Sequence, residues 1–228
     1  MLYDETVVRA NIRNREGKRV FFLGHGDQLT SGARDFLTRE RIPILPAEQA
    51  KITRYRLENG GYLDEKPEHM THLHGDVLVE KTHPRIAFRG AMDTLEARLL
   101  LCGSMAHGQA ARELAEILDF ARSLIRCDVL EETVKLDKLC GLTESELRLR
   151  SHRPQEFYGQ PHFMPGFSDS PLLLQLNLCR CAARAAELAA ARAFFGGAGT
   201  GRTDILQALN RMSSMLWILM IREKAGKL

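Results

Sequence analysis

Residues 171–195 read PLLLQLNLCRCAARAAELAAARAFF, and this stretch decides the fold. It has no internal proline, and its apolar or small residues occupy almost every side. Pro171 stands at the favoured first position of a helix. The pattern predicts a helix from Ser170-Pro171 to about Phe195, ended by Gly196-Gly197. A helix that is apolar on nearly every side is normally buried, so other helices must cover it.

Three charged residues interrupt this apolar helix. Arg180, Arg184 and Glu187 follow one another at i, i+4 and i+7, and Asn177 lies one turn earlier, so all four share one face. Charges on a buried helix must be paired or must bind a ligand, because unpaired burial costs several kcal/mol. Two guanidinium groups in register suit an oligophosphate or carboxylates. An internal salt-bridge network or a solvated stripe would show the same pattern, and periodicity alone leaves these alternatives open.

The last helix, predicted from Thr203 or its neighbour to about Lys224, repeats the theme. Arg211 lies on a polar stripe with Asp204, Gln207 and Ser214, and Asn210 flanks it, while the rest of the helix is apolar. Two helices that each carry a polar stripe through an apolar body suggest that the stripes meet. The alternative is that this stripe faces solvent.

The composition shifts near residue 68, and the remaining sequence from about residue 85 is also helical in pattern. Segments 85–102 and 107–127 are rich in helix formers, and Thr143 with Glu146 forms a capping box at the start of a short helix. Residues 152–169 form a long connection, and connections of this length are often functional. We therefore predict a mainly α chain, with an up-and-down bundle of about five helices over residues 67–228.

Residues 1–66 have a different pattern and are predicted to form a small α/β appendage. Residues 20–23 are a strand candidate, and 29–37 read as a short helix capped by Thr30 or Ser31. Residues 42–45 are a second strand candidate, and the neighbouring prolines favour an edge of a sheet. The role of this appendage is open between partner docking and a share in a ligand pocket.

Composition excludes several classes of protein. The chain has 228 residues, of which 44% are hydrophobic and 27% charged, with a net charge of +3. These values are typical of a globular protein and give no sign of a nucleic-acid or membrane partner. No apolar run is long enough to cross a membrane, and the N-terminus lacks a signal-peptide pattern. The cytoplasm is the expected compartment.

Metal ligands are sparse in the sequence. The five cysteines form no C-x-x-C pair, which argues against disulfides and zinc knuckles. His69, His72 and His74 make an H-x-x-H-x-H cluster, read either as metal ligands or as surface histidines on a loop. Thr71 and Lys81 flank a glycine-containing segment that could cradle phosphate, although no Walker A motif is present.

Four stretches together resemble the ethanolamine-utilisation corrinoid adenosyltransferases, the EutT type. They are THL at 71–73, KTHPRIAFRGAMD at 81–93, GLTESELRLRSHRP at 141–154 and RTDILQALNRMSS at 202–214. The resemblance runs from about residue 69 to 221. It implies a helical bundle similar to that of the propanediol-utilisation adenosyltransferases, assembled as a homo-oligomer, a dimer or a trimer, with ATP and corrinoid bound between subunits.

The resemblance also implies the activity. Such enzymes transfer the 5′-deoxyadenosyl group of ATP to Co(I) of reduced cobalamin, making adenosylcobalamin and releasing triphosphate, with Mg²⁺ on the phosphates. Ethanolamine utilisation, association with a bacterial microcompartment, and a corrinoid reductase or a cobalamin-dependent ammonia-lyase as partner follow from the same resemblance. The alternatives are a non-enzymatic corrinoid chaperone or microcompartment-associated interaction protein of the same fold, and another ATP-dependent transferase on this bundle.

Family roles carry over only to positions that match the family's patterns. The resemblance implies catalytic roles for Arg184, Glu187 and Asn210. It implies an intersubunit ion pair between Asp93 and Arg180, and it suggests Phe163 as the aromatic side chain that displaces the lower axial corrin ligand. The residues implied to bind ATP or corrinoid are Thr71, Lys81, Phe163, Arg180, Arg184, Glu187, Asn210 and Arg211.

The chain departs from the family in its cysteines. Some members carry a Cys-rich cluster just before the Thr-His-Leu stretch, and that cluster binds a divalent metal. No cysteine precedes Cys102 here, so a divalent metal beyond Mg²⁺ is not expected. His69, His72 and His74 are the candidate substitutes for that cluster.

Overall fold

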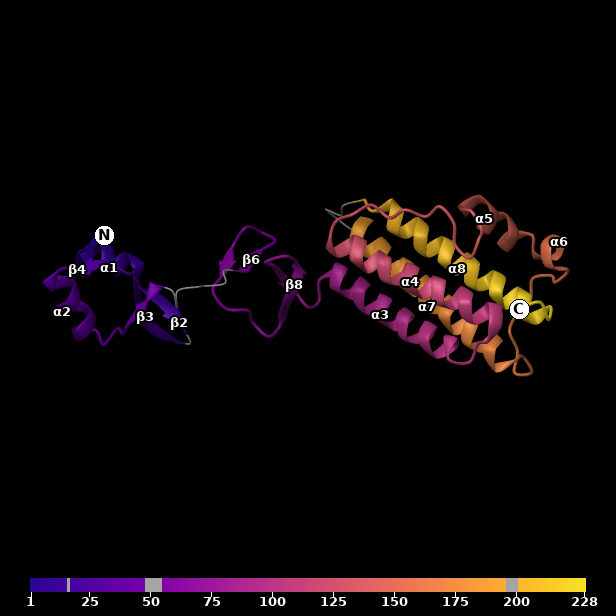
Figure 1. Cartoon of the computed structure of the whole chain (residues 1–228), viewed down its shortest axis with the longest axis horizontal. Helices are drawn as coiled ribbons and strands as arrows, with labels where there is room; N and C mark the ends of the chain where they lie inside the picture. The colour runs from indigo at the N-terminus through magenta and orange to yellow at the C-terminus, as the bar shows by residue number, and fades with distance from the viewer. Residues whose placement is uncertain (16, 48–54, 196–200) are drawn as a thin grey trace. The chain divides into compact units, whose positions relative to one another are not determined.

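The structure of the chain, a computed structural model, divides into two compact units (Figure 1). It describes residues 1–15, 17–47, 55–195 and 201–228. The units are Met1–Val79 and Glu80–Leu228. The helix end predicted at Gly196-Gly197 lies outside the described residues.

The first unit combines short strands with the helices α1 and α2. Its elements are β1 (Leu2–Tyr3), α1 (Glu5–Asn11), β2 (Arg13–Arg15), β3 (Lys18–Leu23), β4 (Gln28–Leu29), α2 (Ser31–Arg39), β5 (Ile44–Pro46), β6 (Tyr55–Leu57), β7 (Tyr62–Leu63), β8 (Met70–His74) and β9 (Val77–Glu80). Among the described residues, the strands pair in the orders β1-β4, β2-β3-β5 and β7-β6-β9-β8.

The α/β prediction for the N-terminal part is confirmed. The strand predicted at 20–23 forms the last four of the six residues of β3, and β5 lies at an edge of its sheet, as its prolines suggested. Thr30 caps α2, because its Oγ1 accepts a hydrogen bond from the backbone N–H of Ala33 at 3.3 Å. A small core lies under these elements and consists of Val8, Phe21, Leu29, Ala33, Phe36, Leu37 and Ile42.

The boundary between the units falls later than the sequence suggested. The appendage was expected to end at residue 66, whereas the contacts place residues up to Val79 in the first unit. The physical reason is hydrogen bonding, because β9 pairs with β6, Arg56 opposite Val77, and β8 lies beside β9.

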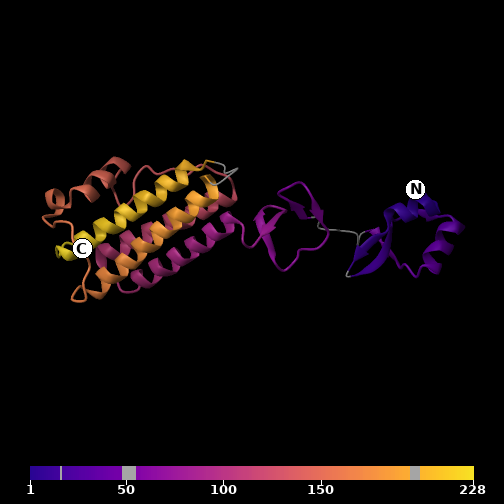
Figure 2. The ribbon, with the colours of Figure 1, turned by 180° about the vertical axis from the view of Figure 1, so that it is seen from behind.

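The second unit is a helical bundle, as the sequence predicts. Its helices are α3 (Pro84–Gly103), α4 (Gly108–Val129), α5 (Glu144–His152), α6 (Pro154–Tyr158), α7 (Pro171–Phe195) and α8 (Thr203–Lys224). Helix α7 packs against both α3 and α8, while α5 covers part of α8. Figures 1 and 2 show the long helices side by side from opposite directions. No helix among the described residues is both long enough and apolar enough to cross a membrane.

Helix α7 is less buried than the sequence suggested. Its buried stripe is formed by Leu173, Leu176, Cys179, Ala183, Ala186, Ala190 and Phe194. On the opposite side, Leu174, Leu178 and Leu188 are exposed by 37%, 39% and 54%. No helix of the described chain covers that side of α7 strongly enough to bury these leucines.

The predicted capping box at the start of α5 is confirmed. Thr143 Oγ1 accepts from the N–H of Glu146, and the Glu146 carboxylate accepts from the N–H of Thr143 at 2.9 Å. Helix α8 begins at Thr203 as predicted, and the neighbouring Arg202 occupies the cap position without a side-chain capping hydrogen bond.

The long connection predicted over 152–169 is only partly irregular. It contains α6, which Pro154 begins and Gly159 ends with φ of +73°. A proline at the first position costs a helix no hydrogen bond, and a glycine accepts this left-handed conformation without strain. The segment after Gly159 runs back to α7 without helix or strand.

Candidate functional site

The polar stripes of α7 and α8 meet in the bundle. Asn210 Nδ2 donates a hydrogen bond to Glu187 Oε1 at 3.0 Å, and Arg211 Nη2 donates to Asn210 Oδ1. The hydroxyl of Ser214 donates to the backbone carbonyl of Asn210 at 3.1 Å. The contact that the sequence suggested between the two stripes is therefore present.

The arginines of this site are not part of an internal salt-bridge network. Arg180 and Arg184 have no acidic ion-pair partner among the described residues, and Glu187 bonds to an amide instead of a cation. The Nε and Nη1 atoms of Arg211 are buried and have no hydrogen-bond partner within the described chain. Buried donors are nearly always satisfied, so this arrangement favours an anionic or polar ligand.

Two pockets adjoin along α7 and α8, and both are lined by Asn210 and Arg211. The smaller, of about 490 Å³, is otherwise lined by Glu187, Ala191, Phe195, Thr203, Leu206 and Gln207. The larger, of about 680 Å³, has both aromatic and basic side chains in its lining. It includes Phe163, Arg180 and Arg184. Together the pockets unite every site residue that the sequence predicted on α7, on α8 and in the connection before α7.

An aromatic cluster forms one wall of the larger pocket. Trp217 stacks with Phe163, with ring centroids 5.1 Å apart, and with His162, at 5.8 Å. The guanidinium of Arg180 lies 5.3 Å from the centre of the Trp217 ring, an attractive cation–π arrangement. Sequence reasoning missed Trp217 and His162 as site residues. The spacing of Asn210, Ser214 and Trp217, at i, i+4 and i+7, was the signal that could have found the tryptophan.

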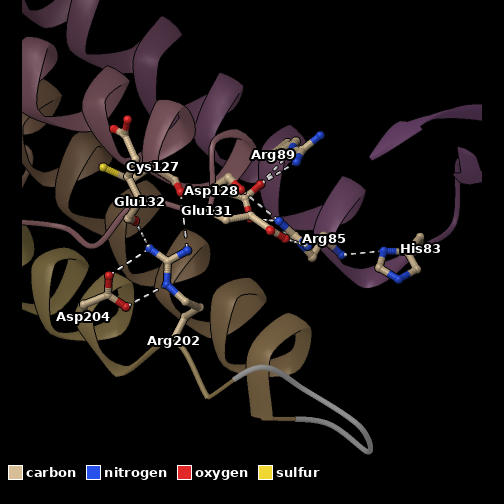
Figure 3. A network of polar contacts seen from close by, with 9 residues as sticks. All are labelled: His83, Arg85, Arg89, Cys127, Asp128, Glu131, Glu132, Arg202 and Asp204. Carbon is tan, nitrogen blue, oxygen red and sulfur yellow. Dashed lines mark hydrogen bonds and ion pairs between the residues drawn. The ribbon is translucent and has the colours of Figure 1, made fainter. Parts of the chain in front are cut away.

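Two ionic clusters brace the end of the bundle where α8 begins (Figure 3). The carboxylate of Asp128, fully buried, accepts from Arg85 Nε at 3.0 Å and from Arg89 Nε at 2.7 Å. Arg202 binds both carboxylate oxygens of Asp204, at 2.9 and 2.8 Å, and its Nη2 also donates to the carbonyl of Glu132 at 2.7 Å. These contacts attach the first turn of α8, which borders the smaller pocket, to the segment after α4.

The Arg202–Asp204 pair gives an acid-dependent stability prediction. Hydrogen bonds from Arg202 lower the pKa of Asp204 from 3.8 to about 2. Because the pKa of Asp204 is lower in the folded than in the unfolded chain, its carboxylate stabilises the fold at pH values above the unfolded pKa. This contribution to the free energy of unfolding disappears as the pH falls from about 4 to about 2. Asp204→Asn should therefore reduce the free energy of unfolding by about 2 kcal/mol near neutral pH.

Thermal unfolding of both proteins, followed by circular dichroism between neutral pH and about pH 2, measures this effect. The difference between them should shrink as the pH falls. A difference that stays constant would contradict the role of the pair. Asp119→Asn, at an exposed position of α4, is the matched control and should leave stability unchanged.

Several predicted residues lie apart from the pockets or are not placed relative to them. Thr71 is on β8 in the first unit. Asp93 is exposed on α3. Lys81 precedes α3, whose Phe88 packs against Phe194 with ring centroids 5.5 Å apart, so it belongs to the end of the bundle that holds the smaller pocket.

The predicted histidine cluster does not assemble a metal site. His72 and His74 lie on β8, and His69 precedes it. In the described parts of the chain, no three His, Cys, Asp or Glu side chains gather where they could hold a metal ion. Cys102 and Cys179 are buried in the bundle core, which agrees with packing roles for these thiols.

Comparisons with known proteins agree with this architecture. The family described as cobalamin adenosyltransferase matches residues 61–223. The chain is 34% identical over 157 residues to the corrinoid adenosyltransferase EutT of Salmonella typhimurium strain LT2, and 32% identical to that of Escherichia coli K12. Each alignment covers 68% of this chain, and the chain spans 59% of the length of these curated relatives.

A solved structure shares the fold. A variant of the PduO-type ATP:corrinoid adenosyltransferase from Lactobacillus reuteri, complexed with cobalamin and ATP, aligns with a TM-score of 0.52 and 15% identity. The alignment covers 79% of this chain and 90% of the other. At this identity the likeness concerns the fold alone.

Proposed function

Because the chain belongs to the cobalamin adenosyltransferase family, we propose that it transfers the 5′-deoxyadenosyl group of ATP to the cobalt of a reduced corrinoid. An electron pair of Co(I) forms the Co–C5′ bond, the C5′–O bond breaks, and triphosphate leaves with that bond's electron pair. The likeness to EutT relatives favours a role in ethanolamine utilisation.

The observation that carries the proposal is the pair of adjoining pockets. A transferase of this kind must hold two large substrates so that one carbon atom meets one cobalt atom, and positioning alone supplies much of the rate. Asn210 and Arg211 line both pockets. The reacting atoms therefore belong beside these two residues.

Each pocket suits one substrate. The smaller combines the apolar Phe195 and Leu206 with the polar Glu187 and Gln207, a lining that fits a nucleoside, with the carboxylate available to a ribose hydroxyl. The larger has about 680 Å³ and the aromatic wall of Phe163 and Trp217, which fits part of a flat macrocycle. An apolar wall also hinders water from occupying an axial position of cobalt, so Phe163 would act by exclusion.

The leaving triphosphate needs positive charge. Co(I) is itself a strong nucleophile, so the protein needs no general base, and catalysis reduces to placement and charge neutralisation. Arg184 and Arg211 supply guanidinium groups at the pockets, and Lys81, in the same unit, is assigned to the phosphates. Mg²⁺ is assigned to the phosphate oxygens of ATP, the ligands it commonly takes in nucleotide sites.

Assembly into a homo-oligomer is part of the proposal. Leu174, Leu178 and Leu188 expose an apolar stripe on α7, as expected where a second copy packs. Asp93, exposed on α3, is assigned as the partner of Arg180 in a neighbouring subunit.

Charge reversal tests this ion pair. Asp93→Arg should weaken self-association at least about 10-fold, because two like charges would face each other at the interface. The double variant Asp93→Arg with Arg180→Asp should restore assembly. Sedimentation velocity over a range of protein concentrations measures both. If wild type, the single variant and the double variant associate equally, Asp93 and Arg180 do not form an ion pair at the interface.

The transfer itself is tested anaerobically with Mg-ATP and chemically reduced cobalamin. The proposal expects light-sensitive adenosylcobalamin and triphosphate in equal amounts. Release of diphosphate would indicate a different ATP-dependent transferase. Corrinoid binding without ATP binding, measured by calorimetry, would indicate a chaperone of the same fold.

A further inference from the structure

An imidazole stands in the wall of the larger pocket. His162 directly precedes Phe163, is exposed, and lines the pocket together with it. Imidazole nitrogen is among the commonest ligands of divalent transition metals, cobalt included. The corrin ring supplies four in-plane nitrogen ligands, so its cobalt can take further donors at the two axial positions. An axial donor raises the energy of the orbital that must accept an electron when Co(II) becomes Co(I). An imidazole in this pocket that bound the cobalt would therefore hinder the reduction on which the proposed reaction depends.

The structure shows what restrains this imidazole. The His162 ring lies almost parallel to the Trp217 ring, at 7° with centroids 5.8 Å apart. His162 Nε2 lies 3.4 Å from the backbone carbonyl oxygen of His152, so the tautomer protonated at Nε2 can donate to that oxygen. The lone pair of an imidazole lies in the plane of its ring, so stacking limits the directions in which it can be offered.

Trp217 is itself held in place. Phe163 and the guanidinium of Arg180 both lie against its ring, at 5.1 and 5.3 Å between centres. The segment that carries His162 is fastened to α8, because Ser170 Oγ donates to Glu223 Oε1 at 2.6 Å and Lys224 pairs with Asp169. The tryptophan is thus a fixed platform against which the histidine rests.

We propose that Trp217 is a positioning residue that keeps His162 from becoming an axial ligand of the bound corrinoid's cobalt. The inference deepens the proposed function and rests on it. The carbonyl contact holds Nε2, and stacking on Trp217 fixes the ring plane and with it the direction of the Nδ1 lone pair, while Phe163 presents the apolar face to the cobalt. Removal of the indole should free the ring to rotate toward the metal.

The test uses cob(II)inamide, a corrinoid without its own tethered base, so that nitrogen coordination can come only from the protein. Electron paramagnetic resonance of Co(II) reports an axial nitrogen as a triplet splitting. The wild-type complex should lack this splitting, and Trp217→Leu should show it. Trp217→Phe, which preserves an aromatic platform, should resemble wild type.

Double variants identify the ligand. Trp217→Leu combined with His162→Gln should lose the splitting, whereas the matched control that combines it with His152→Gln should keep it, although His152 also lines the pocket. Nitrogen splitting in the wild-type complex, or its absence in bound Trp217→Leu, would overturn the inference. If circular dichroism shows that Trp217→Leu is unfolded, Trp217→Met replaces it under the same criteria.

Binding is measured separately from coordination. The corrinoid that stays with the protein in equilibrium dialysis is quantified by its visible absorption, a readout that applies equally to wild type and to the Trp217 variants. His162→Gln should bind the corrinoid as wild type does, because Phe163 and Trp217 remain in the pocket. Absence of binding to wild type would contradict the proposed function, whereas binding together with the wrong resonance pattern contradicts only the role of Trp217.

Discussion

Arg184→Ala should lower kcat by about 100-fold or more while leaving the fold intact. The side chain is exposed on α7 and lines the larger pocket, and no carboxylate among the described residues depends on it. Loss of this side chain removes positive charge from the place where negative charge grows on the leaving triphosphate as the C5′–O bond breaks. Alanine is also the best helix former, so the helix itself loses nothing.

Initial rates of adenosylcobalamin formation at saturating ATP, together with urea unfolding, measure the two effects. Arg192→Ala is the matched control, because Arg192 is exposed on the same helix and does not line either pocket. It should retain full activity. Full activity in Arg184→Ala would contradict the assignment of this arginine to the phosphates.

Arg211→Met should lower the same rate by about 100-fold and at the same time raise the free energy of unfolding by about 1 kcal/mol. In the described chain, two nitrogen atoms of Arg211 are buried without partners, which costs stability until a ligand arrives. Methionine fills a similar volume and has no donors to satisfy. Proteins commonly tolerate such a cost at sites that serve a ligand.

Urea unfolding without ligand and turnover with both substrates test the two halves of this prediction. Arg98→Met, at an exposed position of α3, is the control and should change neither quantity much. Loss of stability in Arg211→Met would show that the arginine is structural. Unchanged turnover in Arg211→Met would show that Arg211 does not contribute to the reaction.

The long helices and their starts were predictable because the signals are local. The capping box of Thr143 and Glu146 needs only four consecutive residues, and Pro171 marks the start of α7 in the sequence itself. The polar stripes at Arg180, Arg184 and Glu187 were equally visible from periodicity. Sequence also suggested that they meet the stripe on α8, which the Glu187–Asn210 hydrogen bond confirms.

Features that depend on distant contacts were missed. β9 joins the first unit through its pairing with β6, and β8 pairs with β9; such pairing leaves no local signal in the sequence. The stack of His162 and Phe163 on Trp217 joins residues from separate elements. Periodicity also could not distinguish a salt-bridge network from a ligand site at the arginines of α7. The distinction depends on whether carboxylates from other helices lie close to them.

The most direct test of the account is an experimental structure of the chain with ATP and cobalamin bound together. We expect the nucleoside in the pocket of Glu187 and Gln207, the corrin against Phe163 and Trp217, and C5′ facing the cobalt beside Asn210 and Arg211. A structure with either substrate bound away from the α7–α8 pockets, or with C5′ and cobalt on opposite sides of Asn210, would contradict it.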